Sequence, residues 1–222
     1  MVRRNAYYTL IASLPVLPAR FDVDRCPITW PRLEDRLRML EPEDQATLAR
    51  LLDVLAWDRQ PLDRTDGEMI ARYKALMEKV EHPLVRTLID DRIDLRTIIS
   101  GLRRRRLGWG PPPGIGQWTD LIRRRWGHPQ FGLQTRFPWI EDLDRLVASG
   151  SAREAERLIL TLNWTRWSRA AGDHHFSFEA VLLYVARWAI VNRWTSQNAV
   201  LGRERFESTL AKLLESHVHF DN

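Results

Sequence analysis

The sequence predicts an all-α protein, and three observations support this prediction. Hydrophobic residues recur at helical spacing through most of the 222 residues. Helix starts are marked by proline at a first position and by acids in a first turn. Only Tyr7–Leu14 resembles a strand, and only weakly. With 44% hydrophobic and 28% charged residues, the composition is that of a globular chain.

Three helices are expected in the first half of the chain. The first begins near Pro42 and carries leucines at helical spacing to about residue 57. The second spans about 66–80. The third begins at Pro83 and continues to Arg106 along an apolar stripe. A turn must follow, because Gly108 and the prolines at 111–113 cannot continue a helix.

The second half predicts four more helices and one extended connector. The helices are expected near 117–126, 151–167, 176–194 and 203–217, and the connector at 128–139. The helix at 176–194 is apolar nearly all round, so it should be the centre of its domain. We therefore expect two helical modules, 1–107 and 118–222, joined by a Gly/Pro-rich loop at 108–117.

Membrane-spanning and secreted classes are disfavoured. The most apolar stretch, Phe178–Val191, is too short for a span and contains Glu179 and Arg187. The apolar run near the start ends at Pro15, so we interpret it as mature structure and not as a signal peptide. One cysteine, Cys26, fits a reducing compartment. These features predict a cytoplasmic protein.

The sequence predicts no enzyme, no cofactor and no metal site. The segment 108–118, GWGPPPGIGQW, lacks a phosphate-loop pattern, and its prolines remove N–H donors. The six histidines include two close pairs but show no zinc-ligand spacing. Cys26 has no neighbouring histidine that would activate a thiol.

The positive charge is concentrated between Ser100 and Gly127. This stretch holds seven arginines against one acid, a net charge of +6, whereas the whole chain carries +5. The remainder therefore carries −1. Cations at a helix C-terminus complement its dipole by about 0.3–1 kcal/mol each, but one or two would suffice. We infer a negatively charged counter-surface, which could be nucleic acid, anionic lipid or an acidic protein.

Nine residues of this stretch are candidate partner-binding residues. A protein interface is favoured because tryptophan and arginine are enriched at interface hot spots. Nucleic acid is the alternative, since exposed aromatic rings can stack on bases, although no nucleic-acid-binding motif is present. The candidates are Arg103, Arg104, Arg105, Arg106, Trp109, Trp118, Arg123, Arg124 and Arg125.

The segment IDLRTIISGLRRRRLG, Ile93–Gly108, resembles the family of C/d subunits of V/A-type ATPases. Asp94, Leu95, Ile98, Leu102 and Arg103 match a helix motif of that family, and Thr97 stands where it usually has asparagine. The segments YYTLIASLP, FGLQTRFPW and FSFEAVLLYVARWAIVNRW, with GRERFE beyond, are similar to a short family encoded within bacterial V-type ATPase operons.

The resemblance implies a non-catalytic helical adaptor. Members of the C/d family sit as a socket on the cytoplasmic face of the membrane rotor ring and receive the central shaft. The expected partners are therefore the other V-type ATPase subunits of the rotor, with anionic headgroups as a further possibility, and the expected location is peripheral at the inner membrane. The family offers no catalytic residues to carry over.

Overall fold

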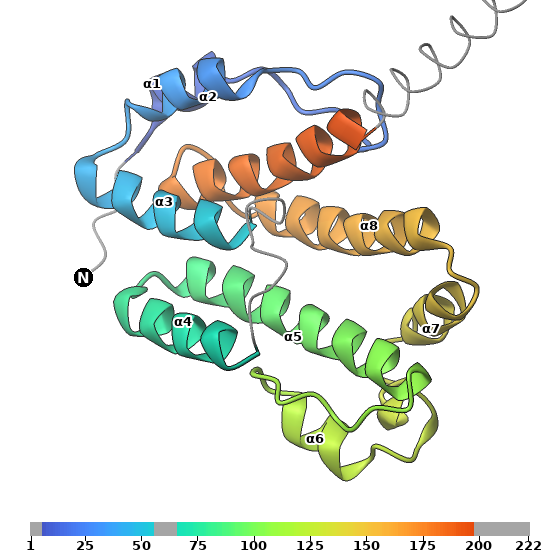
Figure 1. Cartoon of the computed structure of the whole chain (residues 1–222). Coiled ribbons are helices and arrows are strands. Elements are labelled where there is room, and N and C mark those ends of the chain that lie inside the picture. Colours follow the sequence, from blue (N-terminus) through green and yellow to red (C-terminus); the bar gives the residue numbers. More distant parts are fainter. Residues whose placement is uncertain (1–5, 56–65, 198–222) are drawn as a thin grey trace, which may run out of the picture. The chain divides into compact units, whose positions relative to one another are not determined.

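The computed structural model describes residues 6–55 and 66–197, and all regular structure within them is helical. The all-α prediction is confirmed (Figure 1). The chain forms two compact units: a first unit of residues 1–39 and 164–222, and a second unit of residues 40–163. This division differs from the predicted modules 1–107 and 118–222, because the loop at 108–117 lies inside the second unit.

The first unit surrounds the helix at 178–197. Its other helices are α1 (Tyr8–Ser13), α2 (Trp30–Leu37) and the later part of α8 (Ala152–Ala171), which crosses the boundary between the units. The helix 178–197 is buried on nearly every side, as its apolar composition predicts. The buried residues of this helix are Phe178, Val181, Leu182, Leu183, Tyr184, Val185, Ala186, Trp188, Ile190, Val191 and Trp194.

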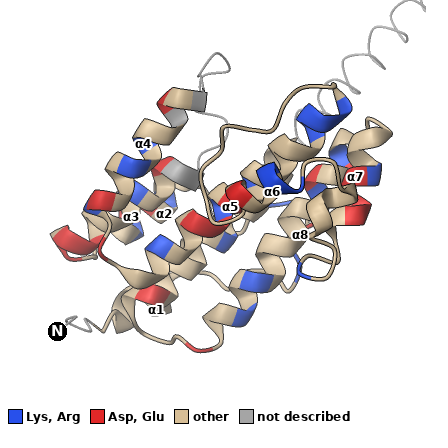
Figure 2. Cartoon of the chain, turned by 90° about the horizontal axis from the view of Figure 1, so that it is seen from below, with Lys and Arg blue, Asp and Glu red and all other residues tan. Residues whose placement is uncertain are grey.

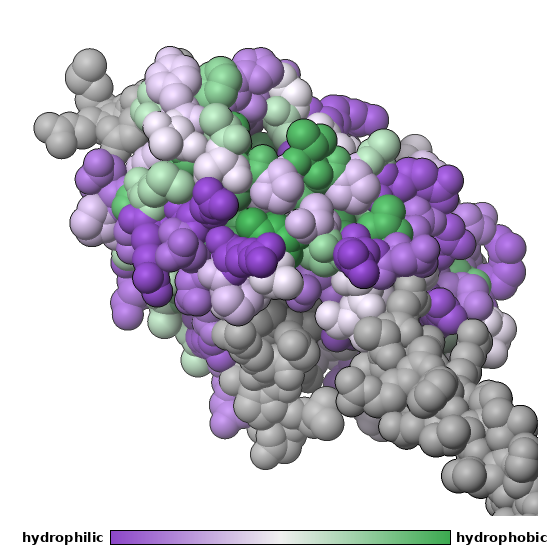
Figure 3. Space-filling model, turned by 90° about the horizontal axis from the view of Figure 1, so that it is seen from above, coloured by the Kyte–Doolittle hydropathy of each residue, from purple (hydrophilic) through white to green (hydrophobic). Residues whose placement is uncertain are grey.

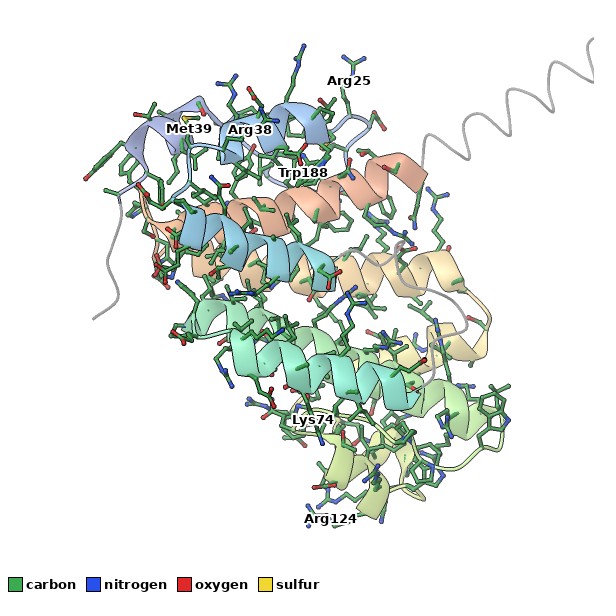
Figure 4. The ribbon with its side chains drawn as sticks, turned by 60° about the vertical axis from the view of Figure 1, so that its left-hand side comes forward. Arg25, Arg38, Met39, Lys74, Arg124 and Trp188 are labelled. Carbon is green, nitrogen blue, oxygen red and sulfur yellow. The ribbon has the colours of Figure 1, made fainter. Side chains whose placement is uncertain are left out.

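Polar atoms of aromatic side chains hold the non-helical segment that precedes α2. Trp188 Nε1 donates to the Ile28 carbonyl at 2.8 Å, and the Tyr184 hydroxyl donates to the Pro15 carbonyl at 2.8 Å. Figure 4 labels Trp188 on its helix. Burial raises the pKa of Tyr184 to about 12. These bonds satisfy backbone carbonyls that no helix or sheet would pair.

The second unit is organised around α5 (Pro83–Arg106), which at 24 residues is the longest helix in the described part of the chain. It contacts α3 (Pro42–Leu55), α6 (Thr119–Arg124) and α7 (Ile140–Ala148), and α4 (Asp66–Lys79) precedes it. A short 3₁₀ helix, Pro129–Gly132, lies between α6 and α7. The buried cluster at this end comprises Leu95, Ile98, Ile99, Leu102, Ile122, Phe131, Leu133, Ile140, Leu143 and Ala155.

Most predicted helices are confirmed, and the helices that were not predicted are short. The helices expected near 42–57, 66–80, 83–106, 117–126, 151–167 and 176–194 are present. Helices α2 and α7 were not predicted from the sequence, and the weak strand candidate is helix α1. The expected connector at 128–139 contains the 3₁₀ helix. The helix expected at 203–217 lies outside the described residues.

Within residues 6–55 and 66–197, no helix is both long enough and apolar enough to cross a membrane. Hydrophobic and hydrophilic residues are intermixed on the face seen from above (Figure 3). Among its described residues, the first unit exposes four large hydrophobic residues, Tyr8, Val16, Met39 and Phe176.

Candidate interaction surface

The C-terminus of α5 ends in a Schellman turn, which explains the glycine at this position. The Trp109 N–H donates to the Arg104 carbonyl at 2.9 Å, and the Gly108 N–H donates to the Arg105 carbonyl at 3.2 Å. Gly108 has φ +70°, in the left-handed region that glycine enters without steric cost. We call Leu107–Gly110 the α5 turn. It positions Trp109 directly beside the arginine run.

Consecutive helical residues point in directions about 100° apart, so the four arginines of α5 meet different neighbours. Arg104 Nε donates to the Gly110 carbonyl at 2.9 Å. Arg105 donates to the carbonyls of Gly127 and His128. Arg106 forms an ion pair with Asp144 of α7, at 2.7 Å from Nη2 to Oδ1. These three arginines therefore fasten the chain around the end of α5.

Arg103 differs from the three arginines that follow it. It is exposed, and no side-chain hydrogen bond or ion pair involves it within the described part of the chain. One helical turn onward lies Leu107, on the same face of the helix. Arg103 is therefore a cation that can bind an external anion without breaking an internal contact.

The second arginine run divides in a similar way. Arg123 Nε donates to the Pro112 carbonyl at 3.4 Å, and Arg123 Nη1 lies 3.9 Å from Asp120 Oδ1. Arg125 is exposed, and its guanidinium passes beside Gly132. Arg124 extends into solvent (Figure 4), and among the residues described it has no side-chain partner. Figure 2 shows the positive residues of α6 and the acidic residues of α7 at this end of the unit.

The two candidate tryptophans have different environments. Trp109 is 57% exposed, with the Arg104 guanidinium 5.6 Å from its ring centroid. Trp118 packs against the buried cluster and meets Phe137 edge-on, with ring centroids 5.2 Å apart. Trp109 is therefore available to a partner, whereas Trp118 contributes mainly to the core.

Two buried polar residues of α5 hold the loop that connects it to α6. Asp94, which is 6% exposed, accepts from the Gln117 N–H at 2.9 Å and from Gln117 Nε2 at 2.7 Å. Thr97 donates to the Ile115 carbonyl at 2.7 Å. Gly116 has φ +108°, and a Cβ there would lie 2.2 Å from Asp94 Oδ1. Asp94 and Thr97 lie in the segment that resembles the C/d subunits, and their role here is to position the loop.

This loop-holding role was not predicted from the sequence. The available signal was a helix with Asp94 and Thr97 among apolar residues, followed by a loop with glycines at 114 and 116. Another acid of α5, the partly buried Asp90, connects this helix to α4. The Tyr73 hydroxyl donates to Asp90 at 2.6 Å, and burial, followed by this hydrogen bond, raises the pKa of Tyr73 above its ordinary value.

Metal and thiol chemistry depend on the surroundings of the histidines, the acids and the cysteine. No group of three or more His, Cys, Asp or Glu side chains there could hold a metal ion. Burial raises the pKa of the Cys26 thiol, which disfavours the reactive thiolate. His174 and His175 precede the helix 178–197, and His217 and His219 lie outside the described residues.

The chain belongs to the family described as "Protein of unknown function (DUF2764)", whose model matches residues 49–217. The match includes all nine candidate partner-binding residues, as well as Asp94 and Thr97. No curated protein and no solved structure matches the chain.

Proposed function

We propose that this member of the DUF2764 family is a non-catalytic helical adaptor of a bacterial V-type ATPase, coupling the central shaft to the membrane rotor ring. Its partners are the shaft and ring subunits, and its location is the cytoplasmic face of the inner membrane. The proposal is supported by the resemblance of Ile93–Gly108 to the C/d subunits and by the similarity of three further segments to a family from V-type ATPase operons.

One structural observation carries the docking role. Arg103 and Arg124 are exposed and have no internal partners among the described residues. The backbone around them is held by hydrogen bonds from four other arginines, Arg104, Arg105, Arg106 and Arg123. A scaffold fixed in this way presents its free cations with little ordering cost on binding. Such cations supply steering and register against an acidic protein surface.

Charge reversal of the two free arginines tests the proposal. The variant R103E/R124E should fold normally, because exposed charges away from internal contacts change stability by about 0.5 kcal/mol or less. It should lose co-purification with rotor subunits, since like charges then face the acidic partner. The matched control is R25E/K74E, which makes the same change of charge at two exposed positions labelled in Figure 4.

Three outcomes are distinguishable. Loss of assembly in R103E/R124E alone supports the adaptor. Normal assembly of both variants contradicts the docking role of the free arginines. Tight binding of the wild-type protein to duplex or single-stranded nucleic acid, abolished only by R103E/R124E, would favour the nucleic-acid alternative, provided that it persists above about 0.2 M salt, where a basic patch alone is screened.

A further inference from the structure

The exposed hydrophobic residues of the second unit are concentrated in the α5 turn. Among the described residues of this unit, the large hydrophobic side chains that are strongly exposed are Leu107, at 61%, and Trp109, at 57%. They are separated by Gly108 alone. The Schellman turn does not require either side chain to be exposed, because it needs only backbone hydrogen bonds and a glycine in the left-handed conformation.

Cations flank both residues. Arg103 lies one helical turn before Leu107 on the same face of α5, and the Arg104 guanidinium lies over the ring of Trp109. The turn therefore combines an aliphatic side chain, an indole and positive charge within a few residues. This combination matches the water–bilayer interface of an anionic membrane, where indole rings locate at headgroup depth and arginines meet lipid phosphates.

The α5 turn is also held in place before any partner arrives. Arg104 Nε donates to the Gly110 carbonyl, and Arg123 Nε donates to the Pro112 carbonyl. The three prolines at 111–113 restrict the backbone that follows. Binding thus requires little ordering of the chain, and the ordering cost that weakens most flexible loops is reduced.

We infer that the α5 turn is a membrane-interface anchor that inserts Trp109 and Leu107 among anionic headgroups. A stable protein–protein interface buries about 800 Å² on each partner around an apolar centre, whereas two apolar side chains bordered by arginines supply a much smaller centre. A bilayer accepts such a small apolar site because its hydrocarbon boundary adapts to the inserted side chains. This inference rests on the proposed function, since it names the lipid surface beside the rotor ring as a second contact of the same end of the molecule.

The test is partitioning of the full-length protein onto vesicles of phosphatidylglycerol and phosphatidylcholine at about 3:7, compared with phosphatidylcholine alone, by flotation. We expect binding to the anionic vesicles only. W109A should lower the partition coefficient about tenfold through lost apolar insertion. R103Q should lower it about fivefold, whereas K74Q, an exposed cation on α4, should change it less than twofold.

Failure of the inference is distinguishable from failure of the adaptor proposal. Equal binding to both vesicle types, no binding to either, or an unchanged partition coefficient in W109A would overturn the membrane anchor. Rotor co-purification in detergent, measured on the same variants, reports the adaptor role separately. If W109A loses rotor subunits there and shows no vesicle defect, the α5 turn is a protein interface instead. Far-ultraviolet circular dichroism of each variant checks that it is folded.

Discussion

Asp94 should be the residue on which the geometry of the Gly/Pro-rich loop most depends. The isosteric change D94N keeps the shape of the side chain but replaces one acceptor oxygen with an NH₂ group. The bonds from Gln117 then lose their charge assistance, and the Gln117 side-chain amide must rotate to avoid placing one NH₂ group against another. Hydrogen bonds to charged groups contribute about 1.5–3 kcal/mol, and relief of carboxylate burial offsets part of the loss. We expect a destabilisation of about 2 kcal/mol.

Two measurements check this prediction. Urea unfolding should give the lower free energy of unfolding for D94N, and hydrogen exchange should accelerate at the Gln117 amide, whose N–H donates to Asp94. The control is D120N, because this carboxylate is 85% exposed and 3.9 Å from its arginine. D120N should change stability by less than about 0.5 kcal/mol. Equal stability of D94N and D120N, with unchanged exchange at Gln117, would refute the loop-holding role.

Three further predictions concern backbone, proton and ligand. G108A should lower the free energy of unfolding by about 1 kcal/mol, from its left-handed φ alone, because open space surrounds Gly108. G116A should lower it by at least about 3 kcal/mol, since the new Cβ would also collide with Asp94. Urea unfolding of both variants measures the difference. Burial raises the pKa of Tyr184 from 10.0 to about 12, so its contribution to stability is complete below pH 10 and is lost between pH 10 and about 12. Phenolate absorbance should then show one late-titrating tyrosine fewer in Y184F. Calorimetry should detect no stoichiometric ATP binding. Tight binding abolished by G110A, a change that open space accommodates, would contradict the non-catalytic proposal.

Helices with long apolar stripes could be predicted from the sequence because their pattern is local. α5 repeats hydrophobic residues over 24 positions, and Pro83 and Gly108 mark its ends. The 9 residues of α7 also place hydrophobic residues at helical spacing, so this helix could have been predicted; Ile140 and Leu143 pack into the buried cluster, with Leu146 and Val147 against it. α1 carries a strand-like composition, yet tertiary packing of Leu10 in the first unit decides its helical state.

The division into units also depended on distant contacts. A proline-rich loop at 108–117 is a reasonable boundary when only local sequence is considered. In the structure, Asp94 and Thr97 bind this loop to the helix that precedes it, so it lies within one unit. Residues near the start of the chain instead join the helix 178–197, through bonds that span more than 150 positions between Tyr184 and Pro15 or Trp188 and Ile28.

The sequence by itself determined the helical class and the location of the excess positive charge, because periodicity and composition are properties of neighbouring residues. Only the tertiary structure decided which arginines are available. Successive helical residues point about 100° apart, so identical neighbours in one run meet different surroundings. The three arginines at 104–106 bind backbone carbonyls and the Asp144 carboxylate. Arg103 instead faces solvent beside Leu107. Availability depends on what the rest of the fold brings to each side of the helix, and no local pattern encodes it.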